Sequence, residues 1–518
     1  MTAEGREALE RWQASRPDNA YEVSPHLGRA LRTRLEDFAR LEPQLHAFGA
    51  VVAQTIDPAV RALELEGPQA DRTEVRFPAA YAEAGRAVWA SGITGAPPFE
   101  QAALFYLLSY AGECGHACPV ACTAGLVRAL RTHASPELCE RFLPPLLTHA
   151  RGSQFLTEAQ GGSDVGANVA AAVPDGDIWR ITGEKWFCSV ADADQFVVTA
   201  RPAGAPPGTR GIGCFLVPRL LDGRPNGFRI RRLKDKVGTR AMATGEIEFE
   251  GALAYPIGAP EDGFRIAAGV VLNTSRWLNA LGSAGLMRRA YLEAAGFASF
   301  REAFGQRIED FPLVRENLAV MRAEEHAALL STLEVTALVD SSDPDEAAYH
   351  RILVNANKFS TSLAATKVAR RAIETLGGNG TIEDFSPLPR LYRDAIVFEN
   401  WEGTHNVLCA QVARDLERYE SLELVLERPR GVDDRVDNAL DELRERMREV
   451  DPLNFRRRLD RYMRALQTAL LFREGEEALA ELHLRRHVLP GWEPADDSDY
   501  RRLLDHCFRE EAAVQFAH

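Results

Sequence analysis

The chain has 518 residues and a formal net charge of −14 at pH 7. Its length allows for about two to four domains with substantial cores. The acidic balance argues against a protein that coats nucleic acid through overall charge, and leaves room only for a local basic patch. No apolar run approaches the roughly 20 residues that cross a bilayer. The polar N-terminus also lacks the apolar stretch of a secretory signal. We therefore expect a cytoplasmic protein with no membrane partner.

Residues 1–152 are predicted to form an α-helical domain. Apolar side chains recur at helical spacing in GRALRTRLEDFARLEPQLHAF and in FEQAALFYLLSYAGECGHACPVACTAGLVRAL. We expect a break near Pro119 in the second of these segments. A further helix should begin near Ser135 and end at Pro144 and Pro145.

The eight cysteines are dispersed, and none forms a CxxC pair. Cys114, Cys118 and Cys122 fall at i, i+4 and i+8, so they share one face of a helix. Such a face could bind a soft metal, but small buried thiols are the favoured interpretation.

From residue 153 to residue 257 the pattern changes to alternation. Short β segments are separated by Gly, Pro and Asp turns, as in DIWRITGEKWFCS, DQFVVTA, GIGCFLVP, GFRIRRL and TGEIEFEG. Such spacing is typical of an antiparallel β domain.

Residues 258–416 return to the helical period. One long helix should carry its apolar face from Trp277 to Ala298, two more should follow, and a fourth should start after Glu402. An antiparallel four-helix bundle is the natural packing. Residues 417–518 are helical in pattern and rich in Arg and Glu, which predicts a helical C-terminal extension.

The sequence WEGT places Glu402 among apolar and small residues. Poor solvation raises the pKa of a carboxylate, which suits a general base working near neutral pH. The alternative is a solvent-facing glutamate beside a helix start, with Thr404 as the capping residue.

A set of motifs in fixed order resembles the acyl-CoA dehydrogenase superfamily. FLTEAQGGSDV resembles its TEPxAGSD signature, GEKWFCS its flavin-contacting strand, and REAFGQRI the RxxFGxxI element of its bundle. ETLGGNG, LYRDA and WEGTHN follow in the family's order, so that the resemblance covers most of residues 20–416. TEAQGGSDV, CPVACT, LKDKVGTRAMAT and the extension look like the AidB-type, alkylation-response branch.

This resemblance implies an α+β fold with an N-terminal helical domain, a middle antiparallel β-barrel, a C-terminal four-helix bundle and the helical extension. It also implies FAD, a homotetramer and dehydrogenation of an acyl-CoA thioester at the Cα–Cβ bond. Glu402 aligns with the residue that takes the α-proton while a β-hydride goes to flavin N5. Arg276 matches an arginine near the thioester and the CoA arm. Glu399 is the local rival to Glu402 but does not align with the catalytic position.

The resemblance also implies a set of cofactor contacts. A flavin ring needs hydroxyl, main-chain and apolar partners, whereas its pyrophosphate needs a cation such as Arg301, which in the family usually reaches across a subunit interface. Glu374 stands where many members carry Gln. The implied contacts are Leu156, Thr157, Gly162, Ser163, Phe187, Ser189, Arg301, Phe304, Glu374, Gly377, Gly378, Thr404 and Asn406.

Other functions remain open at this point. In the AidB-like branch the chain could be a flavoprotein that binds DNA or a protein partner, with weak or vestigial dehydrogenase activity. Arg456, Arg457 and Arg458, with Arg461 and Arg464, suggest a basic face for DNA phosphates, although nearby acids favour surface ion pairs. A flavin oxidase is a further alternative, and the related nitroalkane oxidases use Asp at the position of Glu402. The sequence indicates neither the acyl chain nor the electron acceptor.

Overall fold

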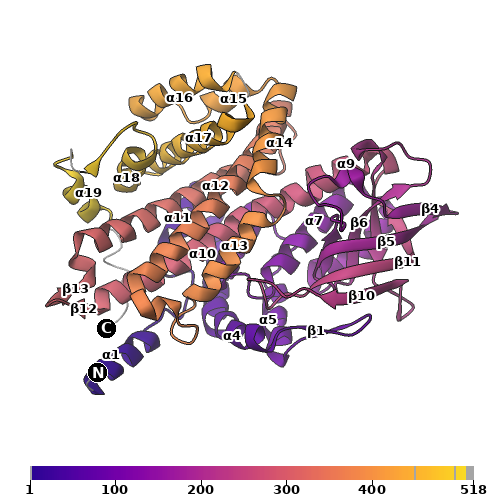
Figure 1. The fold of residues 1–518 in the computed structure, drawn as a ribbon, viewed down its shortest axis with the longest axis horizontal. Helices are drawn as coiled ribbons and strands as arrows, with labels where there is room; N and C mark the ends of the chain where they lie inside the picture. Colours follow the sequence, from indigo (N-terminus) through magenta and orange to yellow (C-terminus); the bar gives the residue numbers. More distant parts are fainter. Residues whose placement is uncertain (1–2, 449–450, 495–496, 509–518) are drawn as a thin grey trace. The chain divides into compact units, whose positions relative to one another are not determined.

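The computed structural model describes residues 3–448, 451–494 and 497–508 (Figure 1). The chain divides into two units. The bundle unit comprises Met1–Gln54, Tyr106–Gly112 and Ala280–His518, and the barrel unit comprises Thr55–Phe105 and Glu113–Asn279. Residues of the predicted N-terminal domain thus occur in both units, and the predicted domain boundaries stay a prediction.

A seven-stranded sheet forms the centre of the barrel unit. Its strands are β3 Gly152–Phe155, β4 Ala171–Asp175, β5 Ile178–Ser189, β6 Gln195–Pro202, β7 Gly213–Pro218, β10 Phe228–Leu233 and β11 Thr244–Pro256. Successive pairs β11–β5, β5–β4, β4–β6, β6–β7 and β7–β11 close a ring, so the predicted barrel is confirmed. Strand β11 pairs with both β5 and β7, and bulges along it provide the bend that this closure requires.

Two strand pairs depart from the predicted antiparallel arrangement. β6 runs parallel to β3 and to β4. A parallel pair needs a long crossover, and residues 156–194 provide one between β3 and β6. The expectation of a wholly antiparallel domain is therefore wrong at these two pairs. Two small ribbons, β1 Gln69–Ala70 with β2 Val75–Arg76 and β8 Leu220–Leu221 with β9 Arg224–Pro225, complete the unit's strands.

The helices preceding the barrel strands begin and end at positions that correct two expectations. They are α4 Asp57–Glu66, α5 Ala79–Ala90, α6 Pro98–Leu108, α7 Ala117–His133 and α8 Pro136–Thr148. The break predicted near Pro119 lies instead at Gly112 and Gly115, which both have positive φ. Pro119 is tolerated because it lies in the first turn of α7, where its missing N–H would have no helical partner.

Helix α8 continues through Pro144 and Pro145 to Thr148, so the prediction that the two prolines end it is wrong. The proline φ angle is itself helical, and the cost is the loss of amide donors. Leu146 is fully buried one residue later and holds this last turn in the core.

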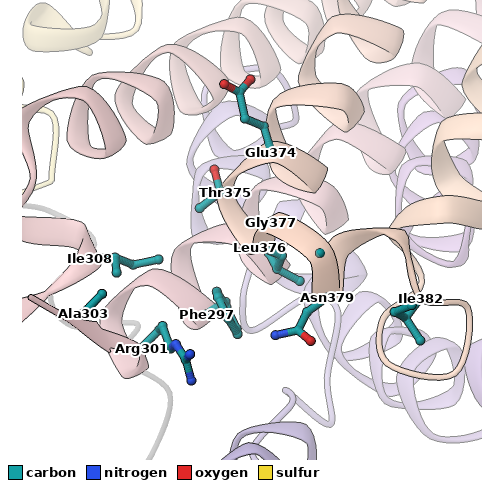
Figure 2. A pocket seen from close by; sticks show the side chains of 11 residues that line it. Phe297, Arg301, Ala303, Ile308, Glu374, Thr375, Leu376, Gly377, Asn379 and Ile382 are labelled. Carbon is teal, nitrogen blue, oxygen red and sulfur yellow. The ribbon is translucent and has the colours of Figure 1, made fainter.

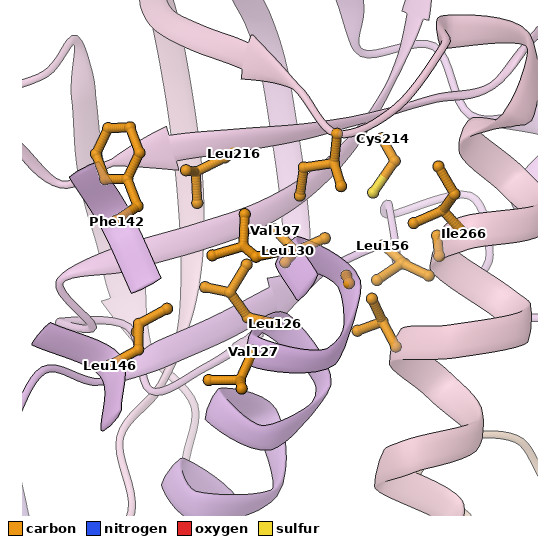
Figure 3. Close-up of a cluster of buried hydrophobic side chains, with 14 of the residues drawn as sticks. Leu126, Val127, Leu130, Phe142, Leu146, Leu156, Val197, Cys214, Leu216 and Ile266 are labelled. Carbon is orange, nitrogen blue, oxygen red and sulfur yellow. The ribbon is translucent and has the colours of Figure 1, made fainter. Parts of the chain in front are cut away.

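Figure 3 shows the apolar cluster between these helices and the barrel. Leu126 and Leu130 of α7 meet Val197 of β6 and Leu216 of β7. Ile266 joins them from the short helix α9 Gly263–Ile266. Each fully buried aliphatic side chain contributes about 1.5–3 kcal/mol, so this cluster fixes the helices on the sheet.

Long helices build the bundle unit, and the four predicted between Trp277 and Leu416 are confirmed. They are α10 Asn273–Phe300, α11 Pro312–Leu338, α12 Pro344–Leu376 and α14 His405–Arg418. Helices α11 and α12 pack side by side (Figure 1). A further helix, α13 Leu388–Asn400, packs on α12 and had no counterpart in the sequence prediction. The N-terminal helices of this unit are α1 Ala3–Ala14, α2 Pro25–Arg32 and α3 Phe38–Val51.

The REAFGQRI segment is a β-hairpin that follows α10. Strands β12 Glu302–Ala303 and β13 Gln306–Arg307 are joined by Phe304 and Gly305, with φ of 54° and 82°. Two successive positive φ angles are typical of a tight hairpin turn.

The C-terminal extension is helical over its described residues, as predicted. Its helices are α15 Leu422–Glu427, α16 Asp434–Met447, α17 Pro452–Arg473, α18 Glu477–His487 and α19 Tyr500–His506. Helix α17 packs on α11, α12 and α14, and α18 packs on α11 and α17. The last part of the predicted extension, residues 509–518, lies outside the described residues. Among the helices that the structure describes, none is both long and apolar enough to span a membrane.

Candidate functional site

Glu402 lies in the short turn between α13 and α14. Its backbone is left-handed, with φ of 56°, and Gly403 follows with φ of 111°. A non-glycine residue in this region costs about 1–3 kcal/mol and persists only where its surroundings enforce it. The side chain is half-buried. Thr404 occupies the N-cap position of α14, but its side chain makes no capping hydrogen bond.

A buried lysine enforces this turn. Lys358 of α12 is fully buried, and its Nζ donates to the carbonyl oxygens of Glu399 (2.9 Å) and Gly403 (3.0 Å). One ammonium group therefore holds the backbone on both sides of Glu402. Sequence reasoning missed Lys358, because in the sequence it is simply one lysine in a long helix.

The carboxylate of Glu399 is half-buried and contacts other side chains of the protein. Its Oε1 accepts a hydrogen bond from Thr366 Oγ1, and its Oε2 lies 3.8 Å from His405 Nδ1. Burial, together with the positive charges of Lys358 and Arg456, lowers the pKa of His405 to about 4, so the imidazole is neutral at pH 7. Glu399 thus has two partners within the protein.

An open pocket of about 620 Å³ brings together several of the predicted cofactor contacts (Figure 2). Arg301, Gly377 and Gly378 line it with Phe297 and Asn379. Gly377 ends α12, and Asn379 belongs to the short 3₁₀ turn that follows. The Asn379 amide, which was not among the predicted contacts, projects into the same opening as the Arg301 guanidinium (Figure 2).

Glu374 lines the same pocket but points away from Arg301 (Figure 2). Its carboxylate is exposed, 3.9 Å from Arg370 one helical turn earlier. The turn requires glycine at position 380, because a Cβ there would lie 2.4 Å from the carbonyl oxygen of Ile373. The glycines of this turn therefore shape the pocket wall as well as ending the helix.

Asn406 lies in the first turn of α14 and is exposed, as is Thr404. Its Oδ1 accepts a hydrogen bond from Arg456 Nη1 at 3.0 Å. Arg456 comes from α17, so the C-terminal extension contacts one of the predicted cofactor residues directly. Sequence reasoning assigned Arg456 only to a possible DNA-binding face.

Three other arginines of that face also have protein partners. Arg458 donates to the carbonyl of Arg446, and Arg461 lies 3.4 Å from Glu442. Arg464 is buried against Glu324 at 2.7 Å. Only Arg457 has no partner among the described contacts, and it is exposed. Duplex binding by these residues stays a prediction.

Phe304, at the tip of the β12–β13 hairpin, belongs to the bundle unit, and the remaining predicted contacts of the flavin lie in the barrel unit. Leu156 is buried at the end of β3, Thr157 and Ser189 are half-buried, and Gly162 and Ser163 are exposed in the loop that follows. Phe187 of β5 is 54% exposed, which is unusual for a phenyl ring on a central strand. An aromatic face beside hydroxyl groups is the surface that an aromatic ligand would cover.

A buried ion pair joins two of the sequence motifs in this unit. Lys185 Nζ of GEKW lies 2.7 Å from Glu158 Oε1 of LTEA, and both side chains are buried. Glu158 also accepts hydrogen bonds from the amides of Val169 (2.7 Å) and Ala170 (3.2 Å). The pair thus fixes the loop carrying Thr157 and Ser163 against β5. The sequence prediction gave neither residue a role.

Arg276 lies in α10, in the part that belongs to the barrel unit. It is buried, and its Nη1 donates to Asn273 Oδ1 at 3.2 Å. Its predicted role toward the substrate stays a prediction. Cys114, Cys118 and Cys122 are buried, as the favoured interpretation expected, and none of the three forms a disulfide. Cys118 and Cys122 lie on α7, whereas Cys114 precedes the helix with φ of 53°, so the three do not share one helical face.

Comparisons with known proteins identify the family of this chain. The family model for the acyl-CoA dehydrogenase middle domain matches residues 153–252, and the model for the C-terminal domain matches residues 261–417. The chain belongs to the acyl-CoA dehydrogenase family, a family of flavoenzyme oxidoreductases.

Two curated relatives are similar over much of the chain. The putative acyl-CoA dehydrogenase AidB of Escherichia coli is 35% identical over 366 residues, 66% of each chain. The matched region is thus just under two thirds of that relative's length. Acyl-CoA dehydrogenase family member 11 of Caenorhabditis elegans is 32% identical over 451 residues, 78% of this chain and 72% of the relative. The predicted resemblance to the AidB-type branch is confirmed.

Solved structures share the fold. C. elegans ACDH-11, in complex with C11-CoA, superposes with a TM-score of 0.83 at 26% identity and covers 95% of this chain and 94% of its own. An acyl-CoA dehydrogenase of Bacillus anthracis complexed with FAD has a TM-score of 0.71 at 20% identity, covering 92% of this chain and 88% of its own. At 20% identity, the similarity to the B. anthracis enzyme establishes only a shared fold.

Proposed function

We propose that this chain is an FAD-dependent dehydrogenase that desaturates the Cα–Cβ bond of an acyl-CoA thioester, with Glu402 as the base. The observation that carries the proposal is the enforced left-handed turn at Glu402, held from both sides by Lys358. Backbone strain maintained by a buried charge is typical of a position that serves chemistry rather than folding.

FAD is the cofactor that the residues of this chain suit. The Arg301 guanidinium provides a cation for the pyrophosphate, and the Asn379 amide in the same pocket adds a donor and an acceptor. The exposed Phe187 ring, with the hydroxyls of Thr157 and Ser189, provides apolar and hydrogen-bonding partners of the kind that a flavin ring requires. Bound FAD supplies the hydride acceptor, N5.

The chain's own residues govern the proton. In the proposed mechanism the Glu402 carboxylate accepts the α-proton, and its backbone amide donates to the thioester carbonyl and so stabilises the developing enolate. The left-handed backbone at Glu402 sets the orientation of its carboxylate and of its amide N–H together. Glu399 takes no part, because Thr366 and His405 hold it.

The substrate class follows from the family and from the structural neighbour with C11-CoA. We include acyl chains around that length among the candidate substrates, with Arg276 near the thioester and CoA arm.

Anaerobic flavin bleaching tests this function. The purified yellow protein is mixed with a panel of straight and branched acyl-CoA thioesters that includes C11-CoA, and flavin absorbance is followed. We expect bleaching with at least one thioester. Glu402→Gln should retain FAD and lose bleaching by about 10²–10⁴-fold, the usual contribution of a general base.

Glu399→Gln is the matched control, since it removes the neighbouring carboxylate and should leave bleaching within a few-fold of the unmodified protein. Equal loss in both variants would contradict the assignment of Glu402. No bleaching across the whole panel would contradict the dehydrogenase function itself.

A further inference from the structure

We propose that Glu324, His483 and His487 form a binding site for a divalent transition-metal ion, Zn²⁺ by ligand chemistry, which ties the C-terminal extension to the helical bundle. His483 and His487 are four residues apart on α18, so they share one face, and Glu324 comes from α11. One potential ligand atom from each lies within 4.8 Å of the others. All three residues belong to the bundle unit.

Hydrogen bonds fix His483 in the tautomer that a metal requires. The Thr468 hydroxyl donates its only proton to the carbonyl of Arg464 at 2.8 Å, so it can only accept from His483 Nδ1, 2.7 Å away. Nδ1 therefore carries the ring proton, and Nε2 carries the lone pair. Within the described residues this Nε2 is buried and has no hydrogen-bond partner. A buried imidazole nitrogen without a partner is costly unless something binds it.

A hydrogen bond to one carboxylate oxygen also orients Glu324. Oε2 accepts from Arg464 Nη1 at 2.7 Å, while Oε1 faces His487 Nε2 at 2.8 Å. Metal-binding carboxylates and imidazoles typically have such outer partners, which orient them toward the ion. A metal would replace the proton now shared between Glu324 and His487.

The local charge accommodates a cation. Arg464 faces two carboxylates, Glu324 and Asp460 (3.7 Å), which leaves one negative charge in excess. Arg486, the other nearby cation, is neutralised by Glu316 at 2.6 Å. Two imidazoles and one carboxylate suit zinc, which binds them at about 2.0–2.2 Å and takes water as a fourth ligand. The His487 side chain is 24% exposed, so water can reach the ion.

A second group of potential ligands, His26, Glu325 and His326, is less suitable. The Tyr106 hydroxyl already bonds to Glu325 Oε1 at 2.7 Å and to His26 Nε2 at 3.1 Å. The fully buried Arg288 adds a positive charge beside His26. Within the described residues, Glu325 Oε2 and both ring nitrogens of His326 have no hydrogen-bond partner. The Arg288 charge nevertheless makes this cluster less suitable for a cation than the first.

Titration of the chelator-treated flavoprotein with Zn²⁺ alone tests the proposal. We expect a single site by calorimetry and a higher melting temperature with zinc. His487→Gln should lower zinc affinity by at least about tenfold while keeping the FAD content and the zinc-free melting temperature. His46→Gln is the matched control, since His46 forms an exposed pair with Glu22 in the same unit and should bind zinc normally.

Thr468→Val tests the tautomer argument with little change in shape. We expect about 10- to 100-fold weaker zinc binding, since the outer partner of His483 is lost. Co²⁺ in the unmodified protein should give visible ligand-field bands at longer wavelength than the flavin, a readout that needs no variant. The proposal is overturned if the unmodified protein binds no zinc, if His487→Gln binds it equally well, or if Thr468→Val has no effect.

Discussion

Lys358 shows how one buried charge can hold the backbone around a proposed catalytic group. A buried ammonium is expensive unless its donors are used, and here both carbonyls that it bonds flank Glu402. The free energy that holds the strained turn is thus provided by α12, a different helix from those that the turn connects. Lys358 is a positioning residue for Glu402.

Lys358→Met tests this at the residue scale. The substitution leaves the carbonyls of Glu399 and Gly403 without their donor, and such unpaired buried groups cost about 1–3 kcal/mol each. We expect a loss of at least about 2 kcal/mol in urea unfolding, and slower acyl-CoA bleaching at unchanged FAD content. Lys367→Met, on an exposed face of the same helix, should stay within about 0.5 kcal/mol. Similar unfolding of the two variants would remove the assigned role.

At the scale of elements, the Glu158–Lys185 pair connects the loop after β3 to β5. Burial alone raises the pKa of Glu158, but the Lys185 ammonium and the bonded amides outweigh it and hold the pKa below its usual value. Folding therefore favours the ionised carboxylate. Its contribution to stability is complete above the usual pKa of 4.5, and it is lost as the pH falls through the lower pKa of the folded state.

Lys185→Met should destabilise the protein by about 3–5 kcal/mol, because it leaves a buried carboxylate without its cation. The stability difference between this variant and the unmodified protein should shrink during acid titration, since burial without the lysine raises the Glu158 pKa and protonation removes the unpaired charge. Glu184→Gln is the control on the same strand, where an exposed pair with Arg231 contributes about 0–1 kcal/mol. Equal effects of the two substitutions on denaturant unfolding would rule out the buried pair as the main connection.

Periodicity predicted the elements whose positions depend on local pattern. The barrel strands and the long helices α10, α11 and α12 follow directly from their spacing of apolar residues. Periodicity failed where tertiary contacts decide, as at Pro144 and Pro145, which remain helical because Leu146 is anchored in the core. The charge pattern of α17 was misleading in the same way. It placed Arg464 on a basic surface, whereas the structure buries Arg464 against Glu324.

The candidate site was predictable only in part, and for a similar reason. Motifs identified Glu402 and the residues of the Arg301 pocket, because their spacing along the chain is distinctive. Lys358 and Asn379 act through contacts between segments that the sequence does not show to be neighbours. Arg456 was noticed for its charge, but its partner Asn406 is 50 positions away.

At the scale of the whole molecule, we propose the homotetramer that the family resemblance implies. The β12–β13 hairpin supports it, because Phe304 at its tip is 97% exposed in the single chain. An exposed phenyl ring on a rigid turn is a candidate contact with another copy of the chain. Arg301, at the base of the same hairpin, would then lie near a subunit interface.

Light scattering tests the assembly. We expect a tetramer for the unmodified protein and smaller species for Phe304→Ser, since burying one phenyl ring contributes about 1.5–3 kcal/mol and each subunit provides one. Leu453→Ser is the control, because Leu453 is 88% exposed on α17, away from the hairpin in sequence. A monomeric unmodified protein, or equal dissociation of both variants, would contradict the proposed interface.

The left-handed backbone at Glu402 has a consequence for how this position evolves. Glycine is the residue that would fold most easily there, since it adopts positive φ without steric cost. Selection for stability alone would thus drive the position toward glycine and away from a carboxylate. A lineage that had abandoned the reaction would gain stability by making that replacement. Glutamate is the more costly residue at this φ, which is expected where the carboxylate serves the proposed proton abstraction.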